Sequence, residues 1–374
     1  MRFDDGKIMS LLERGRSEGV FSIAVAGFVL PDASERIVSI GTPENTVFDI
    51  ASLTKVCPTS TLALASILEG KLSVGTRVKD FIPELNTNFL DDVRIFHLLT
   101  HSLDYRVPMK TLRNLPPEGI LDSLFTYKFE KAPGSDFNYG NPPSVLLGIV
   151  LSRLLGKDLH SLGFEKFFSP LGMKRSGWDP LERKISRICI DEISPTEICA
   201  FRGKEIRGEI HDESAWVLRK LFPVGSAGMF SCVPDLLKFV RMVLNDGVYS
   251  PPQSMAHCVS PVRVTPPGIL RMASENAFAN PEYDEFVRTM DSDVRRNACT
   301  ALGWELNSEK FMGTRVSPRS FGKTGFTGAS IVADASSGAA AVLLSNFTYP
   351  HREPNADRIN SFRREIADAF FGGI

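Results

Sequence analysis

The sequence lacks a strong excess of charge of either sign. Its 374 residues carry 43 lysines and arginines against 44 aspartates and glutamates, which leaves a formal net charge of −1. Attraction to a polyanion needs a basic surface, so this balance argues against a nucleic acid or an anionic membrane as a partner. We therefore expect neither kind of partner.

Long apolar runs are also missing. The stretch from Val145 to Leu151 is among the longest, and a membrane-spanning helix needs about 20 apolar residues. The N-terminal Met1-Arg2-Phe3-Asp4-Asp5-Gly6-Lys7 has acidic residues early and lacks the apolar run of a signal peptide. We therefore expect a cytoplasmic protein without a membrane span.

Cysteines are few and are not arranged as metal ligands. The six cysteines have no Cys-x-x-Cys spacing, and a large chain without an export signal favours reduced thiols over disulfides. His97 and His101 have the four-residue spacing of a metal-binding helix, but Leu98 follows the first histidine where a glutamate is needed. We therefore expect no metal and no cofactor, and interpret both histidines as structural.

The sequence does have the composition of a soluble globular protein, with 43% hydrophobic and 23% charged residues. Strand patterns occur near both ends, at residues 20–30, 36–40, 303–306, 321–324, 329–333 and 339–345. Helices separated by loops fill the middle, and residues 250–300 indicate only loops and short elements. This order predicts one sheet assembled from both chain ends, a helical lobe inserted between them, and a cleft where the lobes meet.

One stretch carries a serine and a lysine three residues apart, in Phe48-Asp49-Ile50-Ala51-Ser52-Leu53-Thr54-Lys55. The pattern predicts a helix from Ser52 to Glu69, on which Lys55 would lie beside the Ser52 hydroxyl. A serine becomes a good nucleophile when a neighbouring amine of lowered pKa accepts its proton. A capping serine followed by a solvated lysine is the alternative interpretation of this pattern.

A second candidate group is Phe137-Asn138-Tyr139-Gly140-Asn141, which precedes a predicted helix at residues 143–155. Nearby lysines would lower the pKa of the Tyr139 hydroxyl and let it carry a proton. Asn141 could orient a substrate amide or Lys55. The alternative is a turn with a packed aromatic ring.

A third candidate group is Gly322-Lys323-Thr324-Gly325-Phe326-Thr327-Gly328, on a predicted strand. Its glycines would let a substrate approach the main chain, and one N–H there could pair with the N–H of Ser52 as an oxyanion hole. Lys323 would supply positive potential. A phosphate loop is rejected, because Ser317 occupies the position of its first glycine and a turn and strand follow instead of a helix.

The segment His211-Asp212-Glu213 is a further polar cluster. It could be a metal or acid–base site, but a polar loop bordering the cleft is the favoured interpretation. The sequence leaves the roles of His211 and Asp212 open.

The order Ser52-Leu53-Thr54-Lys55, Tyr139-Gly140-Asn141 and Lys323-Thr324-Gly325 resembles that of the serine β-lactamase and penicillin-binding protein superfamily. The similarity is to the branch with class C β-lactamases, D,D-peptidases and related esterases. Its fold implies an α/β (α+β) two-lobe protein, with an antiparallel sheet, flanking helices and an inserted helical lobe. Residues 1–374 would form one domain, with 1–60 and 295–374 in the α/β lobe and 61–294 in the helical lobe.

The resemblance also implies roles for the matching residues. Ser52 would be acylated, and Lys55 and Tyr139 would share general-base and general-acid work. Asn141 would position the substrate, while Lys323 and Thr324, next to Gly325, would hold an anionic or polar group. The N–H groups of Ser52 and Phe326 would form the oxyanion hole.

The sequence departs from the family pattern at three places. Ser102-Leu103-Asp104-Tyr105 replaces Thr-Ser-Gly-Leu, Ser226 stands where a histidine is common, and the bulky Phe326 follows the third motif where lactamases place a small hydroxyl residue. The last change resembles the esterase members.

We therefore expect a serine hydrolase acting on a small-molecule ester or amide through a Ser52 acyl-enzyme, of the esterase or D-amino-acid peptidase kind. A β-lactamase or penicillin-binding D,D-peptidase is the alternative within the family. A non-catalytic ligand-binding protein that retains the fold is the alternative of another class. The oligomeric state is left open.

Overall fold

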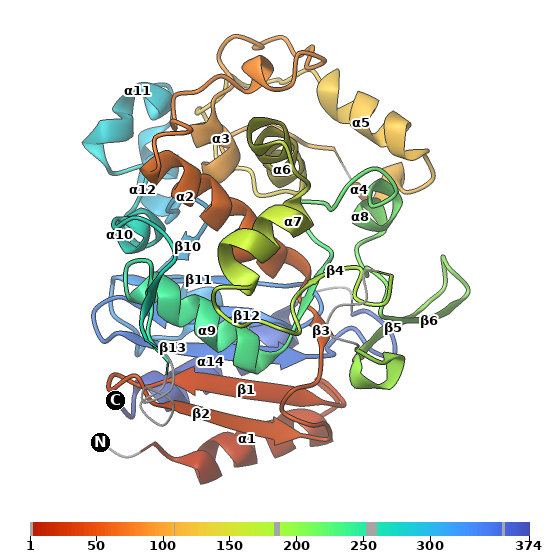
Figure 1. Ribbon diagram of the computed structural model, residues 1–374, viewed down its shortest axis with the longest axis vertical. Helices are drawn as coiled ribbons and strands as arrows, with labels where there is room; N and C mark the ends of the chain where they lie inside the picture. Colours follow the sequence, from red (N-terminus) through yellow and green to blue (C-terminus); the bar gives the residue numbers. More distant parts are fainter. Residues whose placement is uncertain (1–2, 108, 183–187, 252–259, 354–355) are drawn as a thin grey trace.

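The computed structural model describes residues 3–107, 109–182, 188–251, 260–353 and 356–374 (Figure 1). Its main sheet has six strands in the order β10-β11-β12-β13-β1-β2, and every neighbouring pair is antiparallel. The strands are β1 (Ala24–Val29), β2 (Glu35–Ile40), β10 (Glu305–Leu306), β11 (Ser320–Thr324), β12 (Ser330–Asp334) and β13 (Ala339–Ser345). Because β13 pairs with β1, the two chain ends meet in one sheet, and the predicted antiparallel sheet is confirmed.

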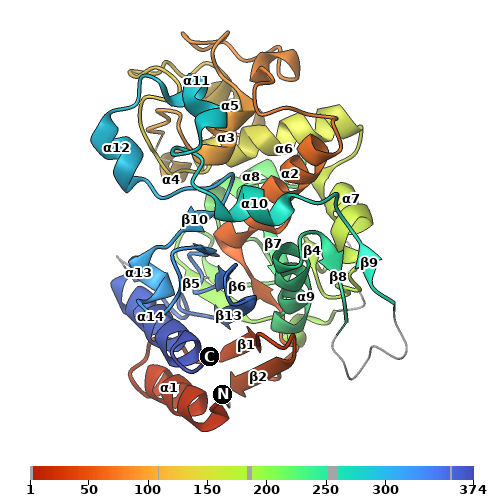
Figure 2. The ribbon, with the colours of Figure 1, turned by 90° about the vertical axis from the view of Figure 1, so that its left-hand side faces the viewer.

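Helices cover both faces of this sheet, as Figure 2 shows from the side. On one face lie α1 (Asp5–Ser17) and α14 (Asp357–Phe371), and on the other lies α9 (Val233–Leu244). Strands β1 and β13 are buried along their whole length, which explains their nearly continuous apolar sequences. A side chain at Gly27 of β1 would come within 2.3 Å of Val233, so α9 can pack this closely only against glycine.

The helical lobe is built from residues between the two halves of the sheet. Its helices are α2 (Thr61–Leu68), α3 (Ile95–Thr100), α4 (Met109–Leu112), α5 (Pro117–Phe125), α6 (Pro142–Leu155), α7 (Leu159–Gly163), α8 (Glu213–Leu218), α10 (Ile269–Ser274), α11 (Asp284–Val287) and α12 (Ser292–Asn297). The short α13 (Glu309–Met312) follows β10. One large hydrophobic cluster includes both this lobe and the inner face of the sheet.

The described residues also form three small sheets. They are β3 (Phe48–Asp49) with β7 (Met229–Ser231) and β4 (Gly177–Trp178), β5 (Pro195–Cys199) with β6 (Lys204–Arg207), and β8 (Val248–Tyr249) with β9 (Val262–Arg263). Residues 260–300 hold short elements, as expected, and residues 252–259 lie outside the described part of the chain. The lobe boundaries near residues 60 and 295 stay a prediction.

The predicted continuous helix from Ser52 to Glu69 is wrong. The structure has a 3₁₀ turn over Ala51–Lys55, a wider turn over Val56–Ser60 and then α2. Cys57 has extended backbone angles, with φ −115° and ψ 98°. The residue before a proline is disfavoured in the α region, and Pro58 therefore breaks the helix.

Residues 51–68 are nevertheless the one described helical stretch that is long and apolar enough to span a membrane by length and composition alone. This stretch does not stand out in the sequence as an apolar run, because Ser52, Thr54 and Lys55 interrupt its start. Within the structure, 83% of it is buried. Its apolar side chains thus contribute to the protein's own core.

Arg363 of α14 ties this helix to the turn between β11 and β12. Its buried guanidinium donates to the carbonyl oxygens of Gly325 at 2.7 Å and Ala329 at 2.8 Å, and to Asn360 Oδ1 at 2.8 Å. Burial lowers the pKa of Arg363 to about 9. The charged side chain of Arg363 thereby holds the turn that follows β11 in place through two of its carbonyl oxygens.

Replacing Arg363 by methionine should destabilise the protein. The variant leaves two buried carbonyl oxygens without their charged donor, so we expect the free energy of unfolding to fall by about 2–4 kcal/mol. Denaturant unfolding measures this change. Arg364→Met, at the exposed neighbouring position, is the matched control and should change the stability by less than about 0.5 kcal/mol; equal losses in the two variants would contradict this role of Arg363.

Candidate active site

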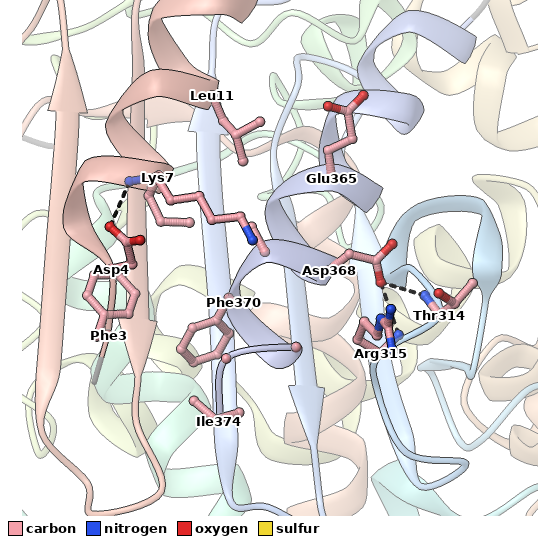
Figure 3. Close-up of a pocket in the computed structure, with 14 residues that line it drawn as sticks. Phe3, Asp4, Lys7, Leu11, Thr314, Arg315, Glu365, Asp368, Phe370 and Ile374 are labelled. Carbon is pink, nitrogen blue, oxygen red and sulfur yellow. Dashed lines mark hydrogen bonds between the residues drawn. The ribbon is translucent and has the colours of Figure 1, made fainter. Parts of the chain in front are cut away.

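Two cavities have very different linings. A cavity of about 770 Å³ lies between the N-terminal part of α1 and the C-terminal end of α14, with Lys7, Glu365 and Asp368 around it (Figure 3). None of the described residues that line it is a serine, cysteine or histidine. A smaller cavity of about 200 Å³ is lined by Ser52, together with His211 and Phe326. The candidate chemistry therefore lies at the smaller cavity.

The backbone before Ser52 is held in an unusual conformation. Ala51 has a positive φ of 47°, which is costly for a residue with a side chain. The buried Asp49 carboxylate accepts hydrogen bonds from the N–H groups of Ala51 at 2.8 Å and His211 at 2.7 Å. Burial raises the pKa of Asp49, although these two hydrogen bonds oppose the rise. Asp49 thus fixes the turn that presents the serine.

Lys55 lies beside Ser52, as the spacing of the two residues predicts. Its Nζ is 3.0 Å from Ser52 Oγ, 2.8 Å from Asn141 Oδ1 and 2.9 Å from the carbonyl oxygen of Ser226. Burial lowers the pKa of Lys55, and the nearby charge of Lys323 lowers it further, while Tyr139 and Asp212 act in the opposite direction. A lysine of lowered pKa can accept the serine proton. The interpretation of Lys55 as a solvated lysine is wrong, because this side chain is buried.

Ser226 meets Lys55 through its main chain and not through its side chain. Its hydroxyl is buried and has no partner among the described residues. Lys55 contacts the main-chain oxygen of residue 226. This contact therefore does not depend on whether the side chain there is serine or the family's usual histidine.

Tyr139 lies between the two lysines. The Nζ of Lys323 is 4.0 Å and that of Lys55 is 5.3 Å from the centre of its ring, and 43% of the residue is exposed. Desolvation acts to raise the pKa of Tyr139, but the charges of Lys323 and Lys55 outweigh it, so the pKa lies below its ordinary value. The structure thus brings Ser52, Lys55 and Tyr139 together, and Tyr139 is suited to proton transfer.

Lys323 on β11 is itself paired with an acid. Its Nζ is 2.8 Å from Glu305 Oε1 on β10, the neighbouring strand. Burial acts to lower the pKa of Lys323, but Glu305 and Tyr139 outweigh it and raise the pKa. Lys323 therefore stays charged, and Glu305 is a site residue that the sequence analysis did not identify.

His101 is a second residue whose place at the site was missed. Its ring centre is 4.8 Å from that of Tyr139, and its carbonyl oxygen accepts the Asn138 N–H at 2.8 Å. Burial, together with Lys323 and Lys55, lowers the pKa of His101 well below its usual value, so the ring is neutral. His97 lies apart from Tyr139 and packs against Phe286. His101 directly follows the last residue of α3, and its contact with the site depends on the Tyr139 loop lying next to it in space.

Asn141 is oriented by Asp212. Asn141 Nδ2 donates to Asp212 Oδ2 at 3.0 Å, which turns its oxygen toward Lys55. The other oxygen of Asp212 accepts from the Ala215 N–H at 2.8 Å and from the Ser214 hydroxyl at 2.7 Å, and so caps α8. The structure thus places the predicted polar loop at residues 211–213 beside the Ser52 cavity, and Asp212 contacts Asn141.

The turn after β11 brings Phe326 close to Ser52. Gly325 packs directly on the main chain before Ser52, since a side chain there would come within 2.4 Å of the Ile50 carbonyl oxygen. The Thr327 hydroxyl donates to the Asp49 carbonyl oxygen at 2.7 Å. The Phe326 N–H has no hydrogen-bond partner among the described residues, and Ser52 lies in the first turn of its helical segment, where N–H groups lack internal acceptors.

Removing the Asp212 carboxylate should misplace Asn141. For Asp212→Ala we expect a stability loss of about 1 kcal/mol from the lost cap, and a 10- to 100-fold slower reaction of Ser52 with an activated ester, because Asn141 loses its orientation. Asp4→Ala removes the comparable cap of α1, and Asp4 does not line the cavity beside Ser52. It should cost similar stability without slowing the reaction, and equal slowing in both variants would count against the positioning role.

The similarity to known proteins agrees with this arrangement. A "Putative D-alanyl-D-alanine carboxypeptidase" of Escherichia coli (strain K12) is 26% identical over 341 residues, covering 83% of this chain and 72% of that protein. The structure of "EstCE1, a hydrolase with promiscuous acyltransferase activity" has a TM-score of 0.69 at 19% identity and covers 98% of each chain. A D-stereospecific amidohydrolase from Streptomyces sp. has a TM-score of 0.65 at 17% identity and covers 99% of each chain. The sequence model of the family described as Beta-lactamase matches residues 36–364, and the chain therefore belongs to the beta-lactamase family of serine hydrolases.

Proposed function

We propose that the protein hydrolyses an ester or a small amide through an acyl-enzyme on Ser52. The single observation that carries this proposal is the 3.0 Å contact between Lys55 Nζ and Ser52 Oγ in surroundings that lower the pKa of the lysine. In its neutral form Lys55 accepts the serine proton as Oγ attacks the substrate carbonyl carbon. The N–H groups of Ser52 and Phe326 hold the negative charge that develops on the carbonyl oxygen.

Tyr139 completes the first half of the reaction. Its hydroxyl gives a proton to the leaving alcohol or amine as the carbonyl carbon loses its bond to that group, and the Lys55 proton then restores the hydroxyl. Water attacks the acyl-enzyme in the second half, as the Tyr139 hydroxyl passes its proton to neutral Lys55 and takes up one proton of the water. The protonated Lys55 then gives a proton to Ser52 Oγ as its bond to the acyl carbon breaks, which releases the acid product and restores all three residues. Asn141 keeps Lys55 in place through both halves.

The choice of ester or small amide over β-lactam rests on two observations. Phe326 places a large side chain, 48% exposed, next to the third motif. Glu305 pairs with Lys323, so the positive charge that would attract a substrate carboxylate is already partly compensated. The names of the curated relatives favour a D-alanyl-D-alanine carboxypeptidase as the second candidate, and a non-catalytic ligand-binding protein is the third.

Covalent labelling separates these functions. We expect the intact mass of the protein to rise by one acyl group on mixing with p-nitrophenyl acetate, and Ser52→Ala to lose the adduct and about 10³-fold or more of the turnover. Benzylpenicillin, followed in parallel, should give neither a lasting adduct nor hydrolysis. An adduct with benzylpenicillin would favour the peptidase or lactamase, and no adduct with either compound in the folded wild-type protein would leave only the ligand-binding protein.

The pH dependence should follow the charges around Tyr139. Because Lys323 lowers the pKa of both Tyr139 and Lys55, Lys323→Met raises both, and the rise of kcat/KM with pH should move to higher pH. Glu305 raises the pKa of Tyr139, so Glu305→Gln should move that rise to lower pH. The measurement is kcat/KM for one uncharged ester from pH 5 to pH 10, and shifts of the same sign in the two variants would refute this assignment.

A further inference from the structure

We propose that the cavity of about 200 Å³ beside Ser52 receives the acyl half of the substrate and selects a compact, uncharged acyl group. This deepens the function proposed above and rests on its acyl-enzyme. Phe326 and Ala227 would limit the length of the acyl chain, and a network of paired charges would exclude charged chains.

The position of the cavity assigns it to the acyl half. It is lined by Ser52, but Lys55, Tyr139 and Lys323 are not among its described lining residues. The leaving group must lie within reach of the hydroxyl of Tyr139, which gives it a proton. The other substituent of the carbonyl carbon is the acyl chain, and the cavity beside Ser52, which none of these three residues lines, is the space available to it.

The volume limits the length of the chain. At about 30 Å³ for each group of the size of a water molecule, about 200 Å³ holds roughly six or seven non-hydrogen atoms. An acetyl or butanoyl group fits, whereas the carbon chain of an octanoyl group exceeds the space. Ala227 is a small, buried residue of the lining, so a larger side chain there would take up part of this volume.

The wall near Phe326 is aromatic. The rings of His211 and Phe326 are stacked, with centres 5.8 Å apart and planes 21° apart. His211 Nε2 is 2.8 Å from Glu197 Oε2, and its main-chain N–H donates to Asp49, so its ring is fixed from two sides. Phe326, half exposed, can pack along an apolar chain that enters from solvent. The Phe326 ring offers apolar surface, and the Nε2 atom of His211 is already paired with Glu197.

Arg352 and Glu213 of the wall already have charged partners, and Asp212 of the wall accepts hydrogen bonds from three neutral donors. Arg352 donates to Glu197 at 2.6 and 2.9 Å and to Glu213 at 3.2 Å, and Glu213 also accepts from Arg113 at 2.8 Å. Desolvation acts to raise the pKa of Glu197, but hydrogen bonds from His211 and Arg352 outweigh it and lower the pKa to about 2, so this acid is ionised.

A charged acyl group gains little in such surroundings. A carboxylate on the substrate would have to take Arg352 from its two acids. An ammonium group would have to take an acid from its arginine, or displace one of the three donors that hold the Asp212 carboxylate. Each change leaves a buried or half-buried charged or polar group without its partner, which is costly. The network therefore favours an uncharged acyl group over an aminoacyl or a dicarboxylic one.

The test compares p-nitrophenyl esters that share a leaving group and differ in the acyl chain. For the wild-type protein we expect kcat/KM for the butanoate ester to be at least about tenfold higher than for the octanoate ester. We expect the same advantage over the anionic succinate ester and the cationic 4-aminobutanoate ester. Ala227→Leu should lower the butanoate-to-acetate ratio by about tenfold or more, because it fills the cavity. Phe326→Ala should raise the octanoate-to-butanoate ratio by a similar factor, because it opens the end of the cavity.

The controls separate this proposal from the proposed function. Phe164→Ala removes a ring of comparable exposure, 51%, that does not line the cavity and should leave all ratios unchanged. Two outcomes would overturn the acyl-pocket assignment while Ser52 acylation stands. In the first, the wild-type protein turns over octanoate or the charged esters as fast as butanoate. In the second, neither Phe326→Ala nor Ala227→Leu changes the ratios. If Ala227→Leu does not fold, the octanoate-to-butanoate ratio of Phe326→Ala tests the limit on chain length by itself. Absence of any adduct on Ser52 would overturn both.

Discussion

The burial of the Lys55 amine beside Ser52 is the interaction on which the rest of the site depends. A lysine in water is protonated at neutral pH and cannot accept a proton, whereas desolvation and the nearby Lys323 favour the neutral amine. The same amine needs hydrogen-bond partners, and Ser52, Asn141 and the Ser226 carbonyl supply them. Each of these groups comes from a different segment, so the fold must bring three distant parts of the chain to one nitrogen atom.

The architecture meets this requirement by joining the chain ends in one sheet. Strand β11 comes from the C-terminal part and packs on the segment that carries Ser52, with Gly325 allowing the main chains to touch. Arg363 of α14 holds the same turn from behind, so a helix near the end of the chain supports the position of Phe326. Stability and site geometry are thus linked through a single turn.

Charge pairing is the second general feature of the site. Lys323 is paired with Glu305, and Arg352, which lines the cavity beside Ser52, is paired with Glu197 and Glu213. Burial and the charges of the two lysines are the main influences on the pKa values of Tyr139 and His101. For the pKa of Lys55, burial is the largest influence, and Tyr139 and Lys323 follow with opposite signs. The charged groups of the site therefore favour proton transfer near Ser52. Because they are paired, they offer little net attraction to a charged ligand.

The sequence by itself determined the elements whose causes are local. The apolar patterns placed the strands of the sheet, and the three-residue spacing placed Lys55 beside Ser52, because such contacts depend only on neighbours along the chain. The break at Cys57 was also local, since Pro58 causes it, but the helical pattern around it concealed the break. Only the tertiary structure decided that Glu305 pairs with Lys323, that His101 packs on Tyr139 and that Asp212 orients Asn141. These partners lie 18, 38 and 71 positions apart in the chain, and no local pattern can encode a contact that exists only after the chain between the two partners has folded.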